Sequence, residues 1–426
     1  MLLLVMFVAL VAMICIHVPI AVALAIAGVI GIVASDGTSA LVNVGLDMYN
    51  GATNFSLIAI PMFVLAGAIM NATGITRRLI AFISALIGFV RGGLAMVNIG
   101  VSLFFAEISG SAVADVAALG SIMIPEMKKR GYSGAFAAAV TSSSASLAII
   151  IPPSIPMILY AVSAGTSVEE LFVAGFVPGL LGAAGLMGVA YVMARRYNLP
   201  VEEAFNLRRL RSTFVEAAPT FLLPIIILGG IFGGLVTATE AAGLAVLAAI
   251  GIGIWYREVD LKELKNAMLD GGMQTAVVML LVASSVLMGS YLTTARVPQE
   301  MAAWMLELTQ NKYVILLILN VFFLVIGFFL HSAAAIILVV PIVIPLVQAA
   351  GIDPVHFGLV VTLNLAIGQQ TPPVASVLIT ACSIAKTGIW EVTKVNIYFV
   401  AVLLTVLLMC TYIPAIPMFL VEAFYR

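Results

Sequence analysis

The sequence predicts an all-α integral membrane protein with about ten to eleven transmembrane helices in two inverted-topology repeats, each carrying a re-entrant helical hairpin. The first observation behind this prediction is composition. Of the 426 residues, 63% are hydrophobic and 9% are charged, and the mean hydropathy is +1.20. These values leave too little polar surface to cover a soluble protein of 44.7 kDa.

The second observation is an internal repeat. The segment from Ala112 to Ala161 matches the segment from Ser332 to Ala381 with a constant shift of 220 positions (332 − 112 = 220) and no gap. Pro152-Pro153 matches Pro372-Pro373. A very apolar chain that repeats a segment broken by Pro and Gly is typical of a secondary transporter. The repeats divide the chain into residues 1–211 and 212–426.

Charge and cysteine usage exclude several other classes. A formal net charge of −1 gives no footprint for nucleic acid. Cys15, Cys382 and Cys410 stand alone in apolar runs, without metal-binding or disulfide spacing, and are expected to be packing residues. The segment from Met1 to Ile16 lacks a basic region and a cleavage site, so we expect a retained membrane helix and not a signal peptide.

Ten apolar runs are long enough to be candidate crossings. The first two are kept apart because the matching region 220 positions later is broken at Thr237-Ala-Thr-Glu240. The ten runs cover about 1–17, 19–34, 55–71, 135–165, 171–194, 214–236, 239–256, 273–291, 355–386 and 395–421.

Basic residues predict the orientation of these crossings. With the N-terminus outside, all but three of the nineteen Lys and Arg residues lie in the cytoplasm, and the three outside are Arg296, Lys312 and Arg426. This distribution is a strong positive-inside signal. Because each half has five crossings, the second copy enters from the opposite face and the repeats are inverted.

Two apolar stretches outside these runs predict the hairpins, at about 97–125 and 313–345. The first lies between Arg91 and Lys128 on one face and is too short for two full crossings and a turn. Its tip is expected at 107–111, and that of the second at 327–332. The amphipathic stretches 77–91 and 297–310 precede them, either as arms along the interface or as the hairpins' first turns.

The two Pro-Pro pairs predict unwound segments at 148–156 and 368–376, each facing its own hairpin tip. Proline removes a backbone donor and disfavours helix at the preceding residue, which frees carbonyl oxygens inside the membrane. In transporters such carbonyls and half-helix C-termini hold cations, while half-helix N-termini face anionic substrates. The alternative is that these prolines only kink their helices.

The oxygen ligands available suit Na⁺ better than a proton relay, because carbonyls and hydroxyls are abundant and carboxylates are sparse. Between the two sites a polar lining suits carboxylates and hydroxyls, although helix–helix hydrogen bonding is the alternative role for each residue. This lining comprises Ser111, Ser144, Ser332, Asn364, Gln369, Gln370, Ser376 and the helix starts after each tip.

Two acidic residues lie deep in the first hairpin, and intramembrane acids are functional candidates. Glu107 and Asp115 have no acidic counterparts, since the shift leads to Gly327 and Ala335. Asp115 is therefore either a cap or hairpin link, or a residue with a substrate or proton role. His331 matches Ser111 and is either a buried hydrogen-bonded residue or a modulator of pH dependence.

Several motifs identify the chain, along essentially its whole length, as similar to the large membrane subunit of tripartite ATP-independent periplasmic (TRAP) transporters, the DctM or SiaM type. They are Glu107-Ile-Ser-Gly-Ser-Ala-Val-Ala-Asp115, Ile151-Pro-Pro-Ser-Ile-Pro156, Pro341-Ile-Val-Ile-Pro345, Gly351-Ile-Asp-Pro-Val-His-Phe357 and Gly368-Gln-Gln-Thr-Pro-Pro373. The resemblance implies no enzyme, but Na⁺-driven uptake of an organic acid, such as sialic acid or a C4-dicarboxylate, across the bacterial inner membrane.

The resemblance also implies an elevator mechanism with scaffold and transport domains, a small membrane subunit of about four helices, and a soluble periplasmic substrate-binding protein. It places one Na⁺ site at Gly327, Gly368, Thr371 and Val374, and another at Ser109, Ser111, Ala148, Ile151 and Ser154. The residues expected to contact substrate are Ser111, Asp115, Ser144, Ser332, Asn364, Gln370 and Ser376. The chain departs from many relatives in having His331 where they have an acidic residue.

Two other functions are consistent with parts of this pattern. A stand-alone Na⁺/carboxylate symporter would share the architecture and need no binding protein. A structural or proton-conducting subunit of a membrane enzyme complex would require a chain of paired intramembrane Lys and Glu residues, and the sequence has none.

Overall fold

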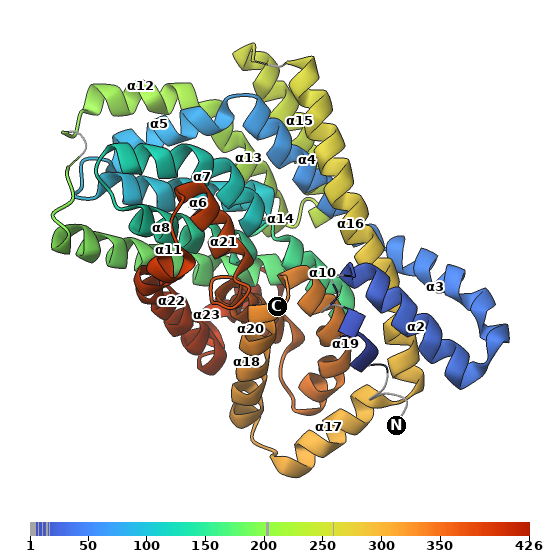
Figure 1. The fold of residues 1–426 in the computed structure, drawn as a ribbon. Helices are drawn as coiled ribbons and strands as arrows, with labels where there is room; N and C mark the ends of the chain where they lie inside the picture. The colour runs from blue at the N-terminus through green and yellow to red at the C-terminus, as the bar shows by residue number, and fades with distance from the viewer. Residues whose placement is uncertain are drawn as a thin grey trace.

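The computed structural model describes residues 6, 8–10, 12, 13, 16 and 18–426, except 202, 203 and 259; the side chains of 36, 107–109, 261, 263 and 267 also lie outside the description. The described chain is all-helical apart from turns and one isolated bridge between Arg91 and Val201 (Figure 1). It is a multi-pass membrane protein, because nine of its described helices are long and apolar enough to span a bilayer.

The first half contains helices that follow the expected order of crossings, arm and hairpin. Their bounds are α2 Ile20–Asp36, α3 Leu41–Ala52, α4 Ala59–Ala72, α5 Ile75–Ile87, α6 Gly93–Ser109, α7 Ala112–Lys129, α8 Gly134–Ala145, α9 Leu147–Ile150, α10 Ile155–Ala164 and α11 Val168–Arg196. Short 3₁₀ turns lie at Thr38–Ala40 and Phe55–Ile58.

The second half begins with the amphipathic helix α12. Its bounds are α12 Leu207–Ala217, α13 Leu222–Pro224, α14 Gly230–Phe232, α15 Ala238–Tyr256, α16 Leu261–Thr294, α17 Val297–Leu308, α18 Lys312–Phe329, α19 Ser332–Ala349, α20 Pro354–Gly368, α21 Ser376–Ala385, α22 Ile389–Tyr412 and α23 Ala415–Tyr425. A 3₁₀ turn at Ala218–Phe221 and a π-helical turn at Ile225–Gly229 connect α12 to α14.

The bounds of several helices repeat at the spacing of the sequence pattern. Helices α7 and α19 begin at Ala112 and Ser332, a spacing of 332 − 112 = 220, and end at Lys129 and Ala349, again 220 apart. Helices α8 and α20 begin at Gly134 and Pro354, also 220 apart. The two halves therefore share one order of elements, from hairpin to broken helix.

The helix pairs α6/α7 and α18/α19 occupy the positions expected for the two hairpins. Helix α5 ends at Ile87 before α6 begins at Gly93, and α17 ends at Leu308 before α18 begins at Lys312. Both amphipathic stretches are thus separate helices and not the hairpins' first turns.

Two details of the expected spans differ in the structure, and a third cannot be compared. The run 395–421 divides at Ile413-Pro414 into α22 and α23, because proline disfavours helix at the residue before it. The exposed helix α3 was not expected and has no buried residue. The run 1–17 falls mostly outside the described residues.

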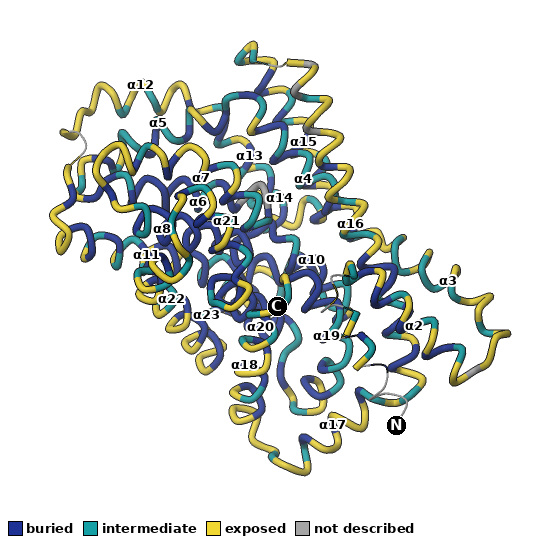
Figure 2. The backbone as a smooth tube through the Cα atoms, in the orientation of Figure 1, coloured by how far each residue is buried: buried dark blue, intermediate teal, exposed yellow. Residues whose placement is uncertain are grey.

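The interior of the molecule is built on α8 and α20, which Figure 2 shows among the dark blue segments. Ten residues of α8, from Phe136 to Ala145, are buried, and so is every residue of α20 after Pro354. Helices that are small or apolar on every side are suited to such positions. The long helix α16 packs instead against α2, α3 and α4 on the other side of the molecule (Figure 1).

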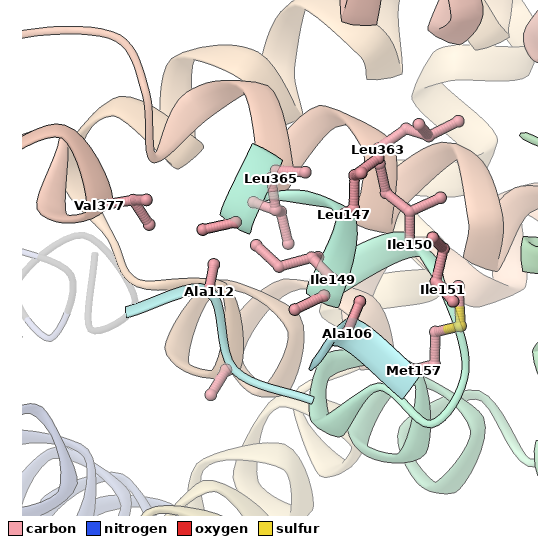
Figure 3. Close-up of a cluster of buried hydrophobic side chains, with 14 of the residues drawn as sticks. Ala106, Ala112, Leu147, Ile149, Ile150, Ile151, Met157, Leu363, Leu365 and Val377 are labelled. Carbon is pink, nitrogen blue, oxygen red and sulfur yellow. The ribbon is translucent and has the colours of Figure 1, made fainter. Parts of the chain in front are cut away.

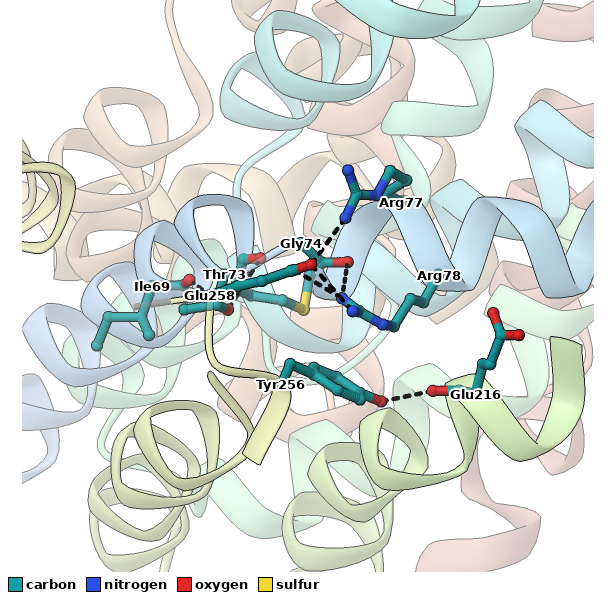
Figure 4. Close-up of polar contacts among 9 residues, drawn as sticks. Ile69, Thr73, Gly74, Arg77, Arg78, Glu216, Tyr256 and Glu258 are labelled. Carbon is teal, nitrogen blue, oxygen red and sulfur yellow. Dashed lines mark hydrogen bonds and ion pairs between the residues drawn. The ribbon is translucent and has the colours of Figure 1, made fainter. Parts of the chain in front are cut away.

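A polar cluster connects the first arm, α5, to the end of α15 and to α12 (Figure 4). Arg78, in α5, lies 2.7 Å from Oε2 of Glu258, and its guanidinium is 3.8 Å from the centre of the Tyr256 ring. The Tyr256 hydroxyl donates to the carbonyl of Glu216 over 2.7 Å. These contacts connect α5, the end of α15 and α12.

Candidate functional site

The tip of the first hairpin docks on the first unwound segment through the backbone. The carbonyl of Gly110 accepts a hydrogen bond of 3.3 Å from the backbone N–H of Ile155. Gly110 has φ +61, and a Cβ there would lie 2.9 Å from the Pro153 carbonyl oxygen. Glycine therefore meets both a left-handed conformation and a close approach at this position.

The second hairpin docks in the same manner. The carbonyl of Phe328 accepts a hydrogen bond of 3.2 Å from the N–H of Val374. Next to this bond, the backbones of α18 and α20 touch, since a Cβ on Gly368 would lie 2.6 Å from Cα of Gly327. These two glycines, expected at a Na⁺ site, are thus brought together.

The broken helices lie where the Pro-Pro pairs are. Helix α9 ends at Ile150 and α10 begins at Ile155, while α20 ends at Gly368 and α21 begins at Ser376. The Pro152-Pro153 and Pro372-Pro373 peptide bonds are both cis. Apolar side chains surround the first break, among them Ala106, Ile149 and Ile151 (Figure 3).

Both hairpin tips reach one cavity of about 510 Å³, which lies between them and helices α2, α4 and α16. Its residues from the first tip are Gly110, Ser111 and Ala112, and those from the second are His331, Ser332, Ala333 and Ala334. Ile149, Ile155, Pro156 and Gln369 come from the unwound segments, and Met273, Gln274 and Val277 from α16. Apolar side chains cover most of the wall.

A second cavity, of about 500 Å³, adjoins the first and shares Val64, Ser111 and Gln274 with it. Its wall is more polar and is formed by α4, α7 and α16. The polar side chains lining it are Asn71, Ser111, Asp115, Asn266, Asp270 and Gln274. The two cavities together lie between the hairpin helices on one side and helices α4 and α16 on the other.

Of the residues expected to contact substrate, three lie at these cavities. Ser111 lines both, Ser332 lines the first, and Asp115 lines the second. Asp115 is buried in the first turn of α7, and Ser111 is the N-cap of that helix. A carboxylate in the first turn is stabilised by the partial positive charge of the helix N-terminus.

Three other expected contacts, Ser144, Asn364 and Gln370, line neither of these two cavities and are buried in hydrogen-bond networks. The Ser144 hydroxyl is 2.9 Å from that of Ser102. Asn364 donates to Oδ1 of Asn320 over 2.7 Å. Packing between helices accounts for both contacts, which was the alternative role.

Gln370 is the centre of the largest of these networks. Its Nε2 donates to the Ser142 carbonyl over 2.7 Å and also to Oγ of Ser146. Its Oε1 accepts from Ser143 over 3.3 Å and from Asn396 over 3.2 Å. The side chain therefore connects the second unwound segment to α8 and α22.

The remaining expected substrate contact, Ser376, is connected to the first cavity only through Gln369. Its hydroxyl donates to Oε1 of Gln369 over 3.4 Å, and Gln369 lines the first cavity. Ser376 itself does not line that cavity.

The other residues expected to bind Na⁺ lie at the two docking points. Ser154 is the N-cap of α10, accepting from Met157 N–H over 3.4 Å and donating to the Ile149 carbonyl over 2.8 Å. Thr371 donates to the Ile367 carbonyl over 3.0 Å. Ala148 and Ile151 are buried, Val374 is 44% exposed, and the side chain of Ser109 lies outside the described residues.

The polar residues that the sequence did not predict lie on the wall of the second cavity that α4 and α16 form, opposite the first hairpin. Asn266, Asp270 and Gln274 lie four residues apart on α16 and so share one face of the helix. A polar stripe of this period in an otherwise apolar span is the signal that marks a cavity-facing side. Asn71, in α4, lies on the same cavity.

Comparison with known proteins places the chain in a family. Residues 7–416 match the family described as Tripartite ATP-independent periplasmic transporter, DctM component. The isethionate TRAP transporter permease protein DctMQ of Oleidesulfovibrio alaskensis is 40% identical over 94% of this chain and 64% of that protein. The C4-dicarboxylate TRAP transporter large permease protein DctM of Pseudomonas aeruginosa is 38% identical, with 88% of each chain covered.

The sialic acid TRAP transporter large permease protein SiaM of Vibrio cholerae is 36% identical, again over 88% of each chain. Among solved structures, the YdaH transporter of Alcanivorax borkumensis has a similar fold, with a TM-score of 0.63, 15% identity and 89% of each chain covered. The chain belongs to the DctM family of TRAP transporter large permease subunits, and it is a transport protein and not an enzyme.

Proposed function

We propose that the protein carries out Na⁺-coupled secondary active uptake of an organic acid by an elevator mechanism, with the substrate in the 510 Å³ cavity. The observation that carries the proposal is that both hairpin tips reach this one cavity. Each tip is docked on its own unwound segment, so tips and segments are suited to move together past α2, α4 and α16.

The coupling ion is proposed from the ligand chemistry at the docking points. Backbone carbonyls and the hydroxyls of Ser111, Ser154 and Thr371 surround the two breaks, and hard monovalent cations take such oxygens. The close approach of Gly327 to Gly368 brings the backbones of two half-helices together at the second site. Two Na⁺ sites, one at each tip, follow from this arrangement.

The substrate class is proposed from the relatives and the wall of the cavity. The relatives named above transport a C4-dicarboxylate, sialic acid and isethionate, all of which are organic anions at neutral pH. Helix N-termini at the hairpin tips suit an anionic group, and the apolar side chains suit its carbon skeleton. Sialic acid and C4-dicarboxylates are the first acids to test.

The partners and location follow from family membership. A tripartite transporter has two further components, proposed here as a small membrane subunit of about four helices and a periplasmic substrate-binding protein. The name DctMQ of one relative is consistent with a large and a small subunit in one chain. We further propose that the protein lies in the bacterial inner membrane and, from the distribution of its basic residues, that its N-terminus is in the periplasm.

Reconstitution tests the transport proposal. Liposomes carrying the chain with its small subunit receive the binding protein and radiolabelled N-acetylneuraminate or succinate. Uptake is expected with an inward Na⁺ gradient and to persist when the proton gradient is collapsed. Full uptake driven by ΔpH alone contradicts Na⁺ coupling, and uptake by this chain alone favours the stand-alone symporter.

Labelling tests the inverted arrangement and the elevator motion. Single cysteines replace Ser109 and Ser332 in a background without Cys15, Cys382 and Cys410. An impermeant thiol reagent is expected to reach position 109 from the cytoplasm and position 332 from the periplasm, at rates that change with substrate and Na⁺. Labelling of both positions from one side in every condition rules out inverted hairpins.

A further inference from the structure

We propose that the acid group of the substrate binds at the second hairpin tip, between the N-terminus of α19 and the side chain of Gln369, while the first tip holds the carbon skeleton. This inference rests on the proposed function and assigns an orientation to the substrate within the same cavity. The observations that carry it are a difference between the two helix N-termini and one buried amide.

The N-terminus of α7 is satisfied by its own residues. The hydroxyl of Ser111 accepts the N–H of Ala114 over 3.5 Å, and Asp115 supplies a carboxylate in the first turn. A hydroxyl cap satisfies one of the free N–H groups, and a carboxylate compensates the helix dipole. This N-terminus therefore has less need of a further anion than one without a cap.

The N-terminus of α19 has no such compensation. Its N-cap residue, His331, makes no side-chain capping hydrogen bond, and the first turn carries no acidic residue. The first N–H groups of any helix lack partners within the helix, and together with the dipole they attract anions. His331, Ser332, Ala333 and Ala334 all line the cavity, so these groups lie at its wall.

Gln369 supplies the second, independent observation. The residue is 1% exposed and lines the same cavity. Its Oε1 accepts from Ser376, whereas its Nε2 has no hydrogen-bond partner among the described residues. Because a buried donor without an acceptor is costly, an oxygen of a bound acid is the acceptor that this amide lacks.

The equivalent position in the first half is apolar. Position 369 − 220 = 149 is Ile149, which lines the same cavity beside Ile155 and Pro156. Apart from Ser111, the wall at the first tip therefore offers contact to carbon atoms, whereas the wall at the second tip offers the amide of Gln369 and the uncapped N-terminus of α19. An organic acid is therefore expected to bind this cavity with an acid group at the second tip.

Binding to the purified full chain in detergent with Na⁺ tests the inference. The probes are radiolabelled succinate, N-acetylneuraminate and isethionate, measured by equilibrium dialysis. For each acid that binds the wild-type chain, Gln369→Leu is expected to weaken affinity by about 10- to 100-fold, the effect of losing a hydrogen bond to a charged group.

Two further variants keep the test independent of folding. Gln369→Met has a similar size but no donor, and it is expected to bind the acids about as weakly as Gln369→Leu while its thermal unfolding stays near that of wild type. Ser284→Ala removes another buried polar atom without a partner in the described chain, away from both cavities, and is expected to leave affinity within about 2-fold.

The outcomes separate this inference from the proposed function. If an acid binds the wild type and binds Gln369→Leu equally well, the orientation is wrong and the function stands. If Asp115→Asn tightens binding while both Gln369 variants change nothing, the acid group lies at the first tip. If none of the three acids binds the wild type, the cavity is not their site and both proposals fail.

Discussion

The first and second halves share one backbone plan but differ in how each satisfies its own polar groups. In the first half, the helices after the hairpin tip and after the break are capped by side chains at their own N-termini, Ser111 for α7 and Ser154 for α10. In the second half, α19 and α21 start without a side-chain cap, and a distant network around Gln370 supports the break. The two halves therefore have similar backbones but different polar contacts. The helix N-termini of the second half lack side-chain caps, so their N–H groups are available to other hydrogen-bond acceptors.

The comparison predicts the largest effect at Gln370, which lies within the second break. Gln370→Leu removes four side-chain hydrogen bonds and strands buried partners on α8 and α22, for an expected loss of about 3–5 kcal/mol in unfolding free energy. The equivalent position, 370 − 220 = 150, is Ile150, where Ile150→Leu is expected to cost less than about 1.5 kcal/mol. Thermal unfolding in detergent measures both, and equal losses would contradict the difference between the halves.

A second prediction concerns the helix contact in the second half. Gly368→Ala places a methyl group 2.6 Å from Gly327 Cα, which forces the two backbones apart at an expected cost of about 1–3 kcal/mol. Na⁺-dependent uptake is expected to fall with it. Ala148→Gly, at the equivalent position of the first half, changes only helix propensity, by about 1 kcal/mol. A fully stable and active Gly368→Ala protein would show that the close contact is not required.

The caps of the second half-helices should respond with opposite signs. Ser154→Ala removes the cap of α10 and is expected to cost about 1 kcal/mol. Ala375, at the start of α21, has φ 43 and no capping side chain, so Ala375→Gly is expected to stabilise by up to about 1 kcal/mol. Unfolding midpoints of the two variants check this, and a shift in the same direction for both would be inconsistent with it.

The smallest expected effect depends on pH and concerns the caps of α8 and α20. Asp353 caps α20 where Ser133 caps α8, 353 − 133 = 220 positions earlier. Burial acts to raise the pKa of Asp353, but hydrogen bonds from Arg426, His356 and Val355 outweigh it and hold that pKa below its ordinary value. The lowered folded-state pKa means that the stabilisation is complete above the unfolded pKa of about 3.9 and is lost as pH falls through the folded value.

Asp353→Ser therefore is expected to lower stability by about 0.5–1 kcal/mol at pH 7, and the difference from wild type should shrink below about pH 4. Ser133→Ala serves as the control, because its loss of a hydroxyl cap is expected to be the same at every pH. Unfolding of the three proteins between pH 3 and pH 7 gives the comparison. A constant difference for Asp353→Ser would exclude titration of this cap.

The positions of the hairpins and unwound segments could be predicted from the sequence because proline and glycine act on the local backbone. The Pro-Pro pairs lie at both breaks, and Gly110 is at the first tip. The direction of a polar side chain is different, because it depends on which helix packs against it. Gln370 and Gln369 are neighbours in sequence, yet the first faces α8 and the second lines the cavity.

The opposite wall was not predicted because it belongs to helices far away in the sequence. Asn266, Asp270 and Gln274 recur every four residues, but the sequence does not show that α16 lies beside the first hairpin. This arrangement is what places the three side chains on the wall of a cavity. The division of the last span at Pro414 was missed for another reason. Hydropathy stays high across residues 395–421, and the proline marks the break without interrupting the apolar run.

The docking of each hairpin through main-chain groups has a consequence for how such a carrier changes its cargo over evolution. The bonds from Ile155 N–H to the Gly110 carbonyl and from Val374 N–H to the Phe328 carbonyl use no side-chain atom. Side chains at Ile149, Ser332 and Gln369 can therefore be exchanged for others without undoing the joints that carry them. The selectivity of the cavity can therefore change by single substitutions while the hairpins stay docked. This property favours redesign of the carrier's preference among organic acids.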